Sequence, residues 1–301
     1  FDSYVATQQL SFEIGEILFP ADPRESHKLF PEARERSPLV AIQDTIVLFG
    51  GASSMHTDVG QIEFTIFDDT WVLDRSTNTW TQLEIEGPSA RQGHSLVTRV
   101  TESGTHAYMF GGASGYFSPS SWLRCSGCSA SYLVSDAYRA FNETWVLDME
   151  AGSWSLATTP GAITAPEPRE GHAAVVRDGQ MIIIGGVDLA GASPQTVIAP
   201  RFRGVQFGDV WSFDFNAGTW TRKSTTNAGP GQIFHHAAMA KGRDILIAGG
   251  VRIDLLGTLH FHDDLWELSS NFAWRKIPVA GQASARAGMT AVLVGSSMLM
   301  F

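Results

Sequence analysis

Lysine and long hydrophobic runs are scarce in this chain of 301 residues. Four Lys stand against 17 Arg, and the 31 acidic residues give a formal net charge of −10. An acidic chain is a poor candidate for sequence-independent binding to DNA or RNA, because that binding depends on neutralising phosphates. No apolar run approaches the roughly 18–20 residues that a membrane-spanning helix needs. We therefore expect no nucleic-acid partner and no insertion into a membrane.

Cysteine is also scarce, since the chain has only Cys125 and Cys128. Two residues make no disulfide framework. The Cys-Ser-Gly-Cys spacing equals half of a zinc site or a redox pair, but a site of four cysteines is impossible here. A site that borrows two histidines stays open, and we favour a local disulfide or two free thiols. Cysteine usage does not determine the compartment; we favour the cytoplasm over secretion.

Glycine and tryptophan are abundant, at 30 and 9 residues, and much of both lies in an internal repeat. Asp68 to Trp80 reads DDTWVLDRSTNTW, and similar segments occupy 142–154, 208–220 and, one residue shorter, 263–274. A repeat of this size usually builds one closed or stacked array. The sequence therefore predicts one repetitive domain with many short strands.

Each copy follows an apolar run that ends in Gly-Gly, as in TIVLFGG at 45–51 and MIIIGG at 181–186. Because these runs are apolar at consecutive positions, both faces of each strand should be buried. Four-stranded antiparallel sheets stacked radially bury both faces in this way. We expect the first tryptophan of each repeat to fill the space between sheets and the second to close the outer strand. An Asx turn should begin at Asp74, Asp148 and Asp214.

The apolar run with Gly-Gly, the TWVLD segment and the second Trp nine residues later resemble the Kelch repeat. The resemblance implies an all-β Kelch-type β-propeller with blades at about 34–85, 88–157, 165–224 and 228–278, and a partial fifth at 283–301. Residues 1–33 form an N-terminal segment, in which 9–17 has the alternation of a strand; it is either a linker or the strand that completes a blade. Six or seven blades are common in this family. The last repeat stops before its Gly-Gly, so we expect the chain to be a fragment.

Length variation is concentrated between strands two and three. The segment from the second Gly to the first Trp spans 20, 33, 25 and 16 positions, whereas the two tryptophans are nine, nine, nine and eight residues apart. In an antiparallel four-stranded sheet, the two-to-three and four-to-one connections leave on the same face. Long loops on a rigid scaffold commonly carry binding residues, so we expect the partner to bind this face.

Aromatic and arginine side chains are frequent in these long connections, and both residue types dominate interface hot spots. The alternative is that the aromatics pin long loops onto the scaffold. The candidate partner-binding residues are Tyr116, Phe117, Trp122, Arg124, Tyr138, Arg201, Arg203, His260 and His262, together with Arg91, Arg169 and Arg286 at the start of strand one.

The strand-one arginines allow two interpretations. As guanidiniums near the central opening, they could bind an acidic partner in bidentate fashion. The alternative, which repetition favours, is internal pairing with Asp69, Glu143, Asp209 and Asp264, each two residues before a repeat tryptophan. His94, His172 and His236 also recur at one position, and we favour a structural role for them over a metal site.

No nucleophile elbow, phosphate loop or His-Glu-x-x-His segment is present. Asn142-Glu-Thr144 is a glycosylation sequon that overlaps the repeat motif. We expect a non-enzymatic scaffold, without a cofactor or metal, that binds a protein partner, an acidic segment among the options. Two alternatives stay open. The first is a glycan- or small-molecule-binding site, or a metal-dependent enzyme, at the channel mouth. The second is a structural module of a larger polypeptide or extracellular assembly.

Overall fold

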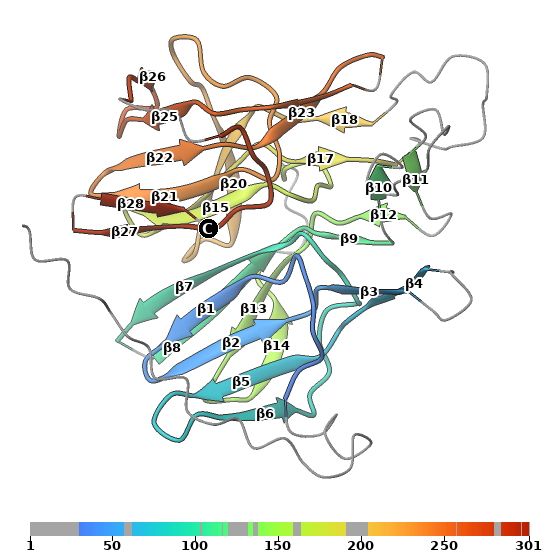
Figure 1. Cartoon of the computed structure of the whole chain (residues 1–301). Coiled ribbons are helices and arrows are strands. Elements are labelled where there is room, and N and C mark those ends of the chain that lie inside the picture. The colour runs from blue at the N-terminus through green and yellow to red at the C-terminus, as the bar shows by residue number, and fades with distance from the viewer. Residues whose placement is uncertain are drawn as a thin grey trace, which may run out of the picture.

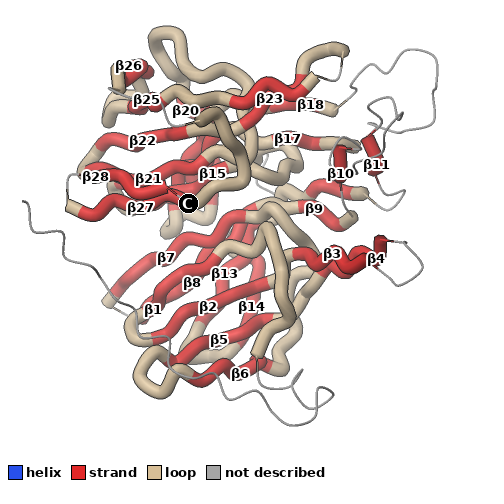
Figure 2. The backbone as a smooth tube through the Cα atoms, in the orientation of Figure 1, coloured by secondary structure: helices blue, strands red, loops and turns tan. Residues whose placement is uncertain are grey.

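The computed structural model describes residues 30–56, 62–102, 104–115, 117–119, 132–134, 138–158, 164–190, 204–256, 258–279, 284–295 and 297–300. Regular structure in these residues is all β-strand (Figure 2). The expected strand at 9–17 lies outside the described residues. No helix in the described part of the chain is long and apolar enough to cross a membrane.

Four antiparallel sheets of four strands follow one another along the chain, each in spatial order one-two-three-four. Blade 1 comprises β1 (Leu39–Ile42), β2 (Thr45–Phe49), β5 (Thr70–Asp74) and β6 (Thr79–Leu83). Blade 2 comprises β7 (Ser95–Thr101), β8 (Gly104–Phe110), β13 (Thr144–Asp148) and β14 (Ser153–Leu156). Blade 3 comprises β15 (Ala173–Arg177), β16 (Gln180–Ile184), β19 (Val210–Asp214) and β20 (Thr219–Lys223).

Blade 4 comprises β21 (Ala237–Lys241), β22 (Asp244–Ala248), β25 (Leu265–Leu268) and β26 (Trp274–Ile277). The fifth repeat contributes the hairpin β27 (Ala291–Val294) and β28 (Ser297–Met300). The innermost strands contact one another in chain order, so the blades fan out around a common axis (Figure 1). The predicted propeller of four-stranded blades is therefore confirmed.

Five two-stranded ribbons extend the connections between strands two and three. They are β3 (Ala52–His56) with β4 (Ile62–Ile66), β9 (Ala113–Ser114) with β12 (Arg139–Ala140), β10 (Phe117–Pro119) with β11 (Tyr132–Val134), β17 (Val187–Asp188) with β18 (Val205–Gln206), and β23 (Val251–Ile253) with β24 (Leu259–Phe261). Figure 1 shows them on the same side of the blades, opposite the strand one-to-two hairpins. This side is the loop-rich face.

The core consists of layers between neighbouring blades. The layer between blades 1 and 2 contains Val47 and Phe49 from one blade and Met109 and Leu147 from the next, all fully buried. Equivalent layers join blades 2 and 3 and blades 3 and 4. Both faces of strand two are thus covered, as the consecutive apolar residues predicted.

The second tryptophans of blades 2, 3 and 4 lie on the outer strand, as expected, and their rings also fill these layers. Trp154 packs edge-on against Phe49 of blade 1, with ring centroids 5.2 Å apart, and its indole donates to the Thr70 hydroxyl at 3.0 Å. Trp220 repeats this contact with Phe110 and Thr144. The outer-strand residue of one blade therefore fixes the blade before it. The Asx turns at Asp74, Asp148 and Asp214 are confirmed by backbone N–H groups that donate to each carboxylate.

The Gly-Gly pair forms the joint between blades. The second glycine of each pair donates its N–H to the backbone carbonyl of the strand-one arginine, or of Ile233 in its place, in the next repeat. The N–O distances are 2.8–2.9 Å at Gly51, Gly112, Gly186 and Gly250. The first glycine has a positive φ, +65° at Gly185, and a Cβ there would lie 2.3 Å from the Ile233 carbonyl oxygen. Any other residue would separate the two blades.

The repeated histidines pack over this joint. A Cβ on Gly185 would lie 3.2 Å from the His236 ring, and His94 and His172 cover Gly50 and Gly111 in the same way. Met289 takes this place over Gly249. Burial lowers the pKa of His94 and of His236 to about 3, and it lowers that of His172 well below its usual range. This packing over the joint favours the structural role expected for them.

We predict that Gly185→Ala destabilises the protein far more than Gly179→Ala. Gly179 also has a positive φ, +71°, but a Cβ there meets nothing within 4 Å. The control should cost about 1–2 kcal/mol for the left-handed backbone alone, whereas Gly185→Ala also breaks the inter-blade joint and should cost roughly 3 kcal/mol or more. Urea unfolding of both variants measures the difference, and equal losses would contradict the joint.

We also predict that acid destabilises the fold through the buried histidines. Their folded pKa values lie below the unfolded value of about 6.5, so their contribution is complete above pH 6.5 and is lost as the pH falls towards 3. Each histidine should contribute a slope of about 1.4 kcal/mol per pH unit within that window. The double variant His94→Met/His236→Met, which introduces the side chain that Met289 has at the equivalent position, should flatten the dependence of unfolding free energy on pH. An unchanged slope would contradict this.

Candidate functional site: the loop-rich face

The ribbons form a second layer above the blades. The inner strand of each of four ribbons pairs with the segment that leads into strand one of its own blade, through the bridges Glu35–Ala52, Gln92–Ala113, Glu170–Val187 and Phe234–Val251. Each blade therefore carries a small sheet on the loop-rich face. This arrangement places the expected binding face on a hydrogen-bonded platform.

The platform over blades 3 and 4 has its own apolar core, made of Val187, Leu189, Phe234, Val251 and Ile253. The amide of Gln206 accepts from the N–H of Ile253 and donates to its C=O, both at 2.6 Å, so that it ties ribbon β17–β18 to ribbon β23–β24. These contacts hold the two ribbons as one unit.

Tyr138, predicted to bind a partner, is one of these ties. Its hydroxyl donates to Glu170 at 3.1 Å and accepts from the N–H of Leu189 at 3.2 Å, and its ring packs on the apolar core. Burial raises the pKa of Glu170, whose second oxygen has no hydrogen-bond partner among the described residues. The phenol of Tyr138 is therefore engaged inside the molecule, which favours the alternative that the aromatics pin long loops.

The strand-one arginines bind inside their own blades. The Arg169 guanidinium donates to the Asp209 carboxylate at 2.6 and 3.2 Å and to the Gly185 carbonyl at 2.9 Å. It stacks 3.9 Å above the Phe207 ring, and the Trp211 indole donates to the same carboxylate at 2.8 Å. Arg34 with Asp69 and Arg91 with Glu143 repeat the arrangement. We call it the arginine–acid–tryptophan contact.

Burial decides the role of these arginines. Arg91 and Arg169 both have 0% exposure. Burial by itself would raise the pKa of Asp209, but the hydrogen bonds and charge of Arg169, with the Trp211 indole, bring it below its usual range. The prediction that Arg91 and Arg169 bind a partner is therefore corrected, because their guanidiniums are enclosed and already paired. The alternative of internal pairing is confirmed for Asp69, Glu143 and Asp209.

Blade 4 departs from the arrangement. Ile233 replaces the arginine, and Asp264 instead pairs at 2.6 Å with Lys276 of β26. The expected pairing of Asp264 with a strand-one arginine was therefore wrong. The guanidinium of Arg286, at the start of the fifth repeat, hydrogen-bonds only to Ser284 among the described residues, and the residue is partly exposed. Its predicted binding role remains a prediction.

The other predicted residues lie in different places. His260 is 2.8 Å from the Asp254 carboxylate in ribbon β23–β24, and its side chain is 40% exposed. His262 is partly buried beside Asp264 and Arg286, and its Nε2 has no partner among the described residues. Asn142 is exposed, directly before β13. Phe117 lies in β10, whose side chains are not described. Tyr116, Trp122, Arg124, Cys125, Cys128, Arg201 and Arg203 lie outside the described residues.

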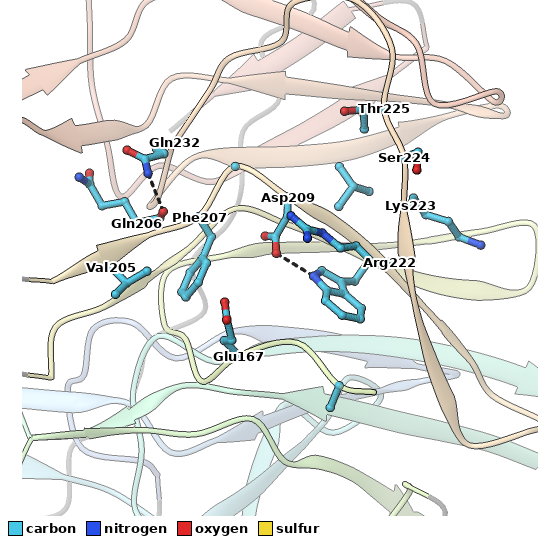
Figure 3. Close-up of a pocket in the computed structure, with 14 residues that line it drawn as sticks. Glu167, Val205, Gln206, Phe207, Asp209, Arg222, Lys223, Ser224, Thr225 and Gln232 are labelled. Carbon is cyan, nitrogen blue, oxygen red and sulfur yellow. Dashed lines mark hydrogen bonds between the residues drawn. The ribbon is translucent and has the colours of Figure 1, made fainter. Parts of the chain in front are cut away.

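An open groove of about 920 Å³ lies on the loop-rich face over blade 3 (Figure 3). Its walls are the segment before β15 with Glu167, the segment 205–209 before β19, and the segment that leads from β20 to Gln232. Figure 3 shows Arg222 extending towards Asp209, with Glu167 on the other wall. We define these residues as the blade-3 groove. It combines free charge, hydroxyls and an aromatic ring in one concave surface.

A second cavity, of about 480 Å³, lies at the axial opening. The residue two positions after the strand-one arginine, or after Ile233 in its place, lines this cavity in each of the five repeats. The N–H of each such residue donates to the carbonyl of the one before it, along the series Arg36, Gly93, Gly171, His235 and Gly288. This position has positive φ throughout, including +55° at Arg36 and +52° at His235. A left-handed backbone at non-glycine residues is uncommon and is favoured at functional sites.

The sequence interpretation missed the residues of both hollows. A signal for Arg36 and His235 existed, because both replace a glycine that the other repeats have. Arg222 left a weaker signal, since its position opposite the first tryptophan differs in every blade. Among the described residues, no three His, Cys, Asp or Glu side chains gather as potential metal ligands.

We predict that Arg169→Gln lowers the free energy of unfolding by about 3–5 kcal/mol, because it leaves a partly buried Asp209 without its cation. Arg286→Gln is the matched control at the equivalent position of the fifth repeat, and it should change stability by less than about 1 kcal/mol. Chemical denaturation measures both. Similar values for the two variants would show that the buried contact is not what holds blade 3.

Comparisons with known proteins agree with this architecture. A family model described as the KLHDC2/KLHL20/DRC7 Kelch-repeats domain matches residues 133–301. The chain is 26% identical to an F-box/kelch-repeat protein of Arabidopsis thaliana, over 84% of this chain and 45% of that protein. It is 25% identical to Kelch domain-containing protein 3 of Bos taurus, over 90% of this chain and 64% of that protein. The chain therefore spans about half to two thirds of the length of these relatives.

More distant similarities show the same fold. Host cell factor 1 of Homo sapiens is 24% identical over 73% of this chain and 12% of that protein. A solved structure, that of YjhT, superposes with a TM-score of 0.59 and 17% identity, covering 90% of this chain and 78% of that one. At this identity, the superposition supports the fold alone. With the matched family model covering more than half of its residues, the chain belongs to the KLHDC2/KLHL20/DRC7 Kelch-repeats domain family.

Proposed function

We propose that this chain is a non-enzymatic binding module that holds a protein partner on its loop-rich face. The variable connections all reach that face, and the ribbons there are tied into a platform by Gln206 and Tyr138. A preorganised surface loses less conformational freedom when a partner binds, which favours affinity. In the part of the chain that the structure describes, the connections on the opposite face are short hairpins.

The observation that carries the proposal is a pair of leucines at the tip of ribbon β23–β24. Leu255 and Leu256 are 81% and 77% exposed. They are held there because Asp254 accepts from the N–H groups of Leu256 and Thr258, both at 2.9 Å. Its carboxylate also lies 2.8 Å from Nε2 of His260. The His260 hydrogen bond, first among these, lowers the pKa of Asp254 to about 2. Two adjacent leucines fixed in water are suited to an apolar pocket of a partner.

The axial cavity supports a second candidate function, the binding of a small molecule. Its volume of about 480 Å³ lies within the range typical of ligand pockets. It combines the Arg36 and His235 side chains with the apolar rings of Phe234 and Phe261. A small molecule retained through purification, seen by native mass spectrometry, would favour this candidate over a protein partner.

We predict that Leu256→Asp lowers the affinity for a partner captured by the wild-type protein by about tenfold or more, because a buried carboxylate would replace an apolar anchor. The partner would be purified and its Kd measured by calorimetry against each variant.

Val100→Asp is the matched control. Val100 is also 77% exposed, but it lies near the end of β7, on the opposite face. It should bind the partner as the wild type does. A loss of affinity with Val100→Asp and none with Leu256→Asp would place the contact on the other face and overturn the proposal.

A further inference from the structure

Arg222 stands out because Asp209, the acid that it could pair with, is already paired with Arg169. It lies opposite Trp211 in the pairing of β19 with β20. The equivalent residues are Gln82 in blade 1, Leu156 in blade 2 and Lys276 in blade 4. A position that differs in every blade is not required for folding.

Blade 4 shows what a cation does here when the acid is available. Its strand-one residue is Ile233, so Asp264 has no arginine, and Lys276 takes over the pairing at 2.6 Å. In blade 3, Arg169 already occupies both oxygens of Asp209, and the Trp211 indole adds a third donor. Arg222 is therefore a second cation for a single acid.

The guanidinium of Arg222 consequently has no hydrogen bond or ion pair in the described part of the chain. It is exposed, and its charge reaches Asp209 only as the last of the influences that lower the pKa of that carboxylate. A guanidinium can bind a carboxylate in bidentate fashion, so an unpaired one in a groove is suited to an incoming acid. Lys223, the next residue of β20, extends away from Arg222 and Asp209 (Figure 3), with its ammonium 5.6 Å from the Phe272 ring centroid.

The other wall limits which anion fits. Arg169 and Asp209 cancel each other, which leaves the charge of Arg222 facing that of Glu167. Glu167 would repel a densely charged ligand such as a polyphosphate. Ser224 and Thr225 offer hydroxyls along the remaining edge, which suits the N–H and C=O groups of a peptide. The charge arrangement fits a peptide that carries one acidic side chain.

We propose that the blade-3 groove is a peptide-binding subsite that takes an isolated acidic side chain of an extended partner segment, with Arg222 as the residue that recognises it. This inference rests on the proposed function, since it names the partner chemistry at one part of the loop-rich face. It assigns the acid recognition to an exposed, unpaired arginine and not to the buried arginines of strand one.

The test uses a phage-displayed library of random linear peptides, selected on the immobilised 301-residue protein. Selected peptides should share an Asp or Glu at a fixed position. Arg222→Gln should weaken the binding of a synthetic selected peptide by about tenfold to a hundredfold, the range for a hydrogen bond to a charged group. Gln82 occupies the equivalent place in blade 1, so the variant should melt as the wild type does.

A double-mutant cycle makes the assignment specific. Changing the shared peptide acid to its amide should cost as much on the wild type as Arg222→Gln does, and it should cost nothing further on Arg222→Gln. Arg243→Gln is the control for net charge, because Arg243 has a side chain 75% exposed on the opposite face. It should bind the peptide as the wild type does.

The results separate this inference from the proposed function. Peptides without a shared acid, or bound equally by Arg222→Gln, overturn the subsite while partner binding that depends on Leu256 still stands. If Arg243→Gln weakens binding as much as Arg222→Gln does, the effect is one of net charge and the subsite is rejected. If neither partner nor peptides respond to any substitution on the loop-rich face, both proposals are rejected.

Discussion

The rest of the structure depends on one backbone hydrogen bond. In it, the second glycine of each pair donates to the carbonyl at the strand-one arginine position of the next repeat. It recurs at all four boundaries between the repeats, at 2.8–2.9 Å. It brings two backbones so close that the preceding glycine has no room for a Cβ, and it leaves a space above that an imidazole or a thioether fills. Apolar layers then close over strand two, and the strand-two-to-three connections must all leave on one face.

Repetition separates the side chains that hold the fold from those that are free to bind. The arginine–acid–tryptophan contact is made in blades 1, 2 and 3, and its guanidinium also stacks on a phenylalanine in each. A buried guanidinium is costly unless its partners are all in place, and blades 1, 2 and 3 each carry the acid and the ring beside the arginine. Arg222, Leu255 and Leu256 belong to no contact that is repeated in this way, and each is exposed on the loop-rich face.

The fourth blade shows that the contact changes as a unit. Where Ile233 replaces the arginine, His262 stands in the place of the stacked phenylalanine, and Lys276 neutralises Asp264. Removing the arginine alone would leave Asp264 without a cation, and Lys276 on the adjacent strand supplies one. Two residues after Ile233, the ring of His235 lies against Gly171. Departures from the repeat are thus concentrated where the axial cavity and the platform meet.

The sequence by itself determined the strands, their order and the face on which variation lies. Consecutive apolar residues before Gly-Gly and tryptophans at nearly constant spacing have few physical solutions, because they recur at the same positions of successive repeats and meet between neighbouring blades. It also contained the internal pairing of Arg91 and Arg169 as one of two interpretations. Only the tertiary structure decided between them, because burial and the occupancy of a carboxylate depend on several segments at once. For the same reason the sequence did not predict the blade-3 groove. Arg222 is unpaired because Arg169, more than fifty positions away, pairs with Asp209.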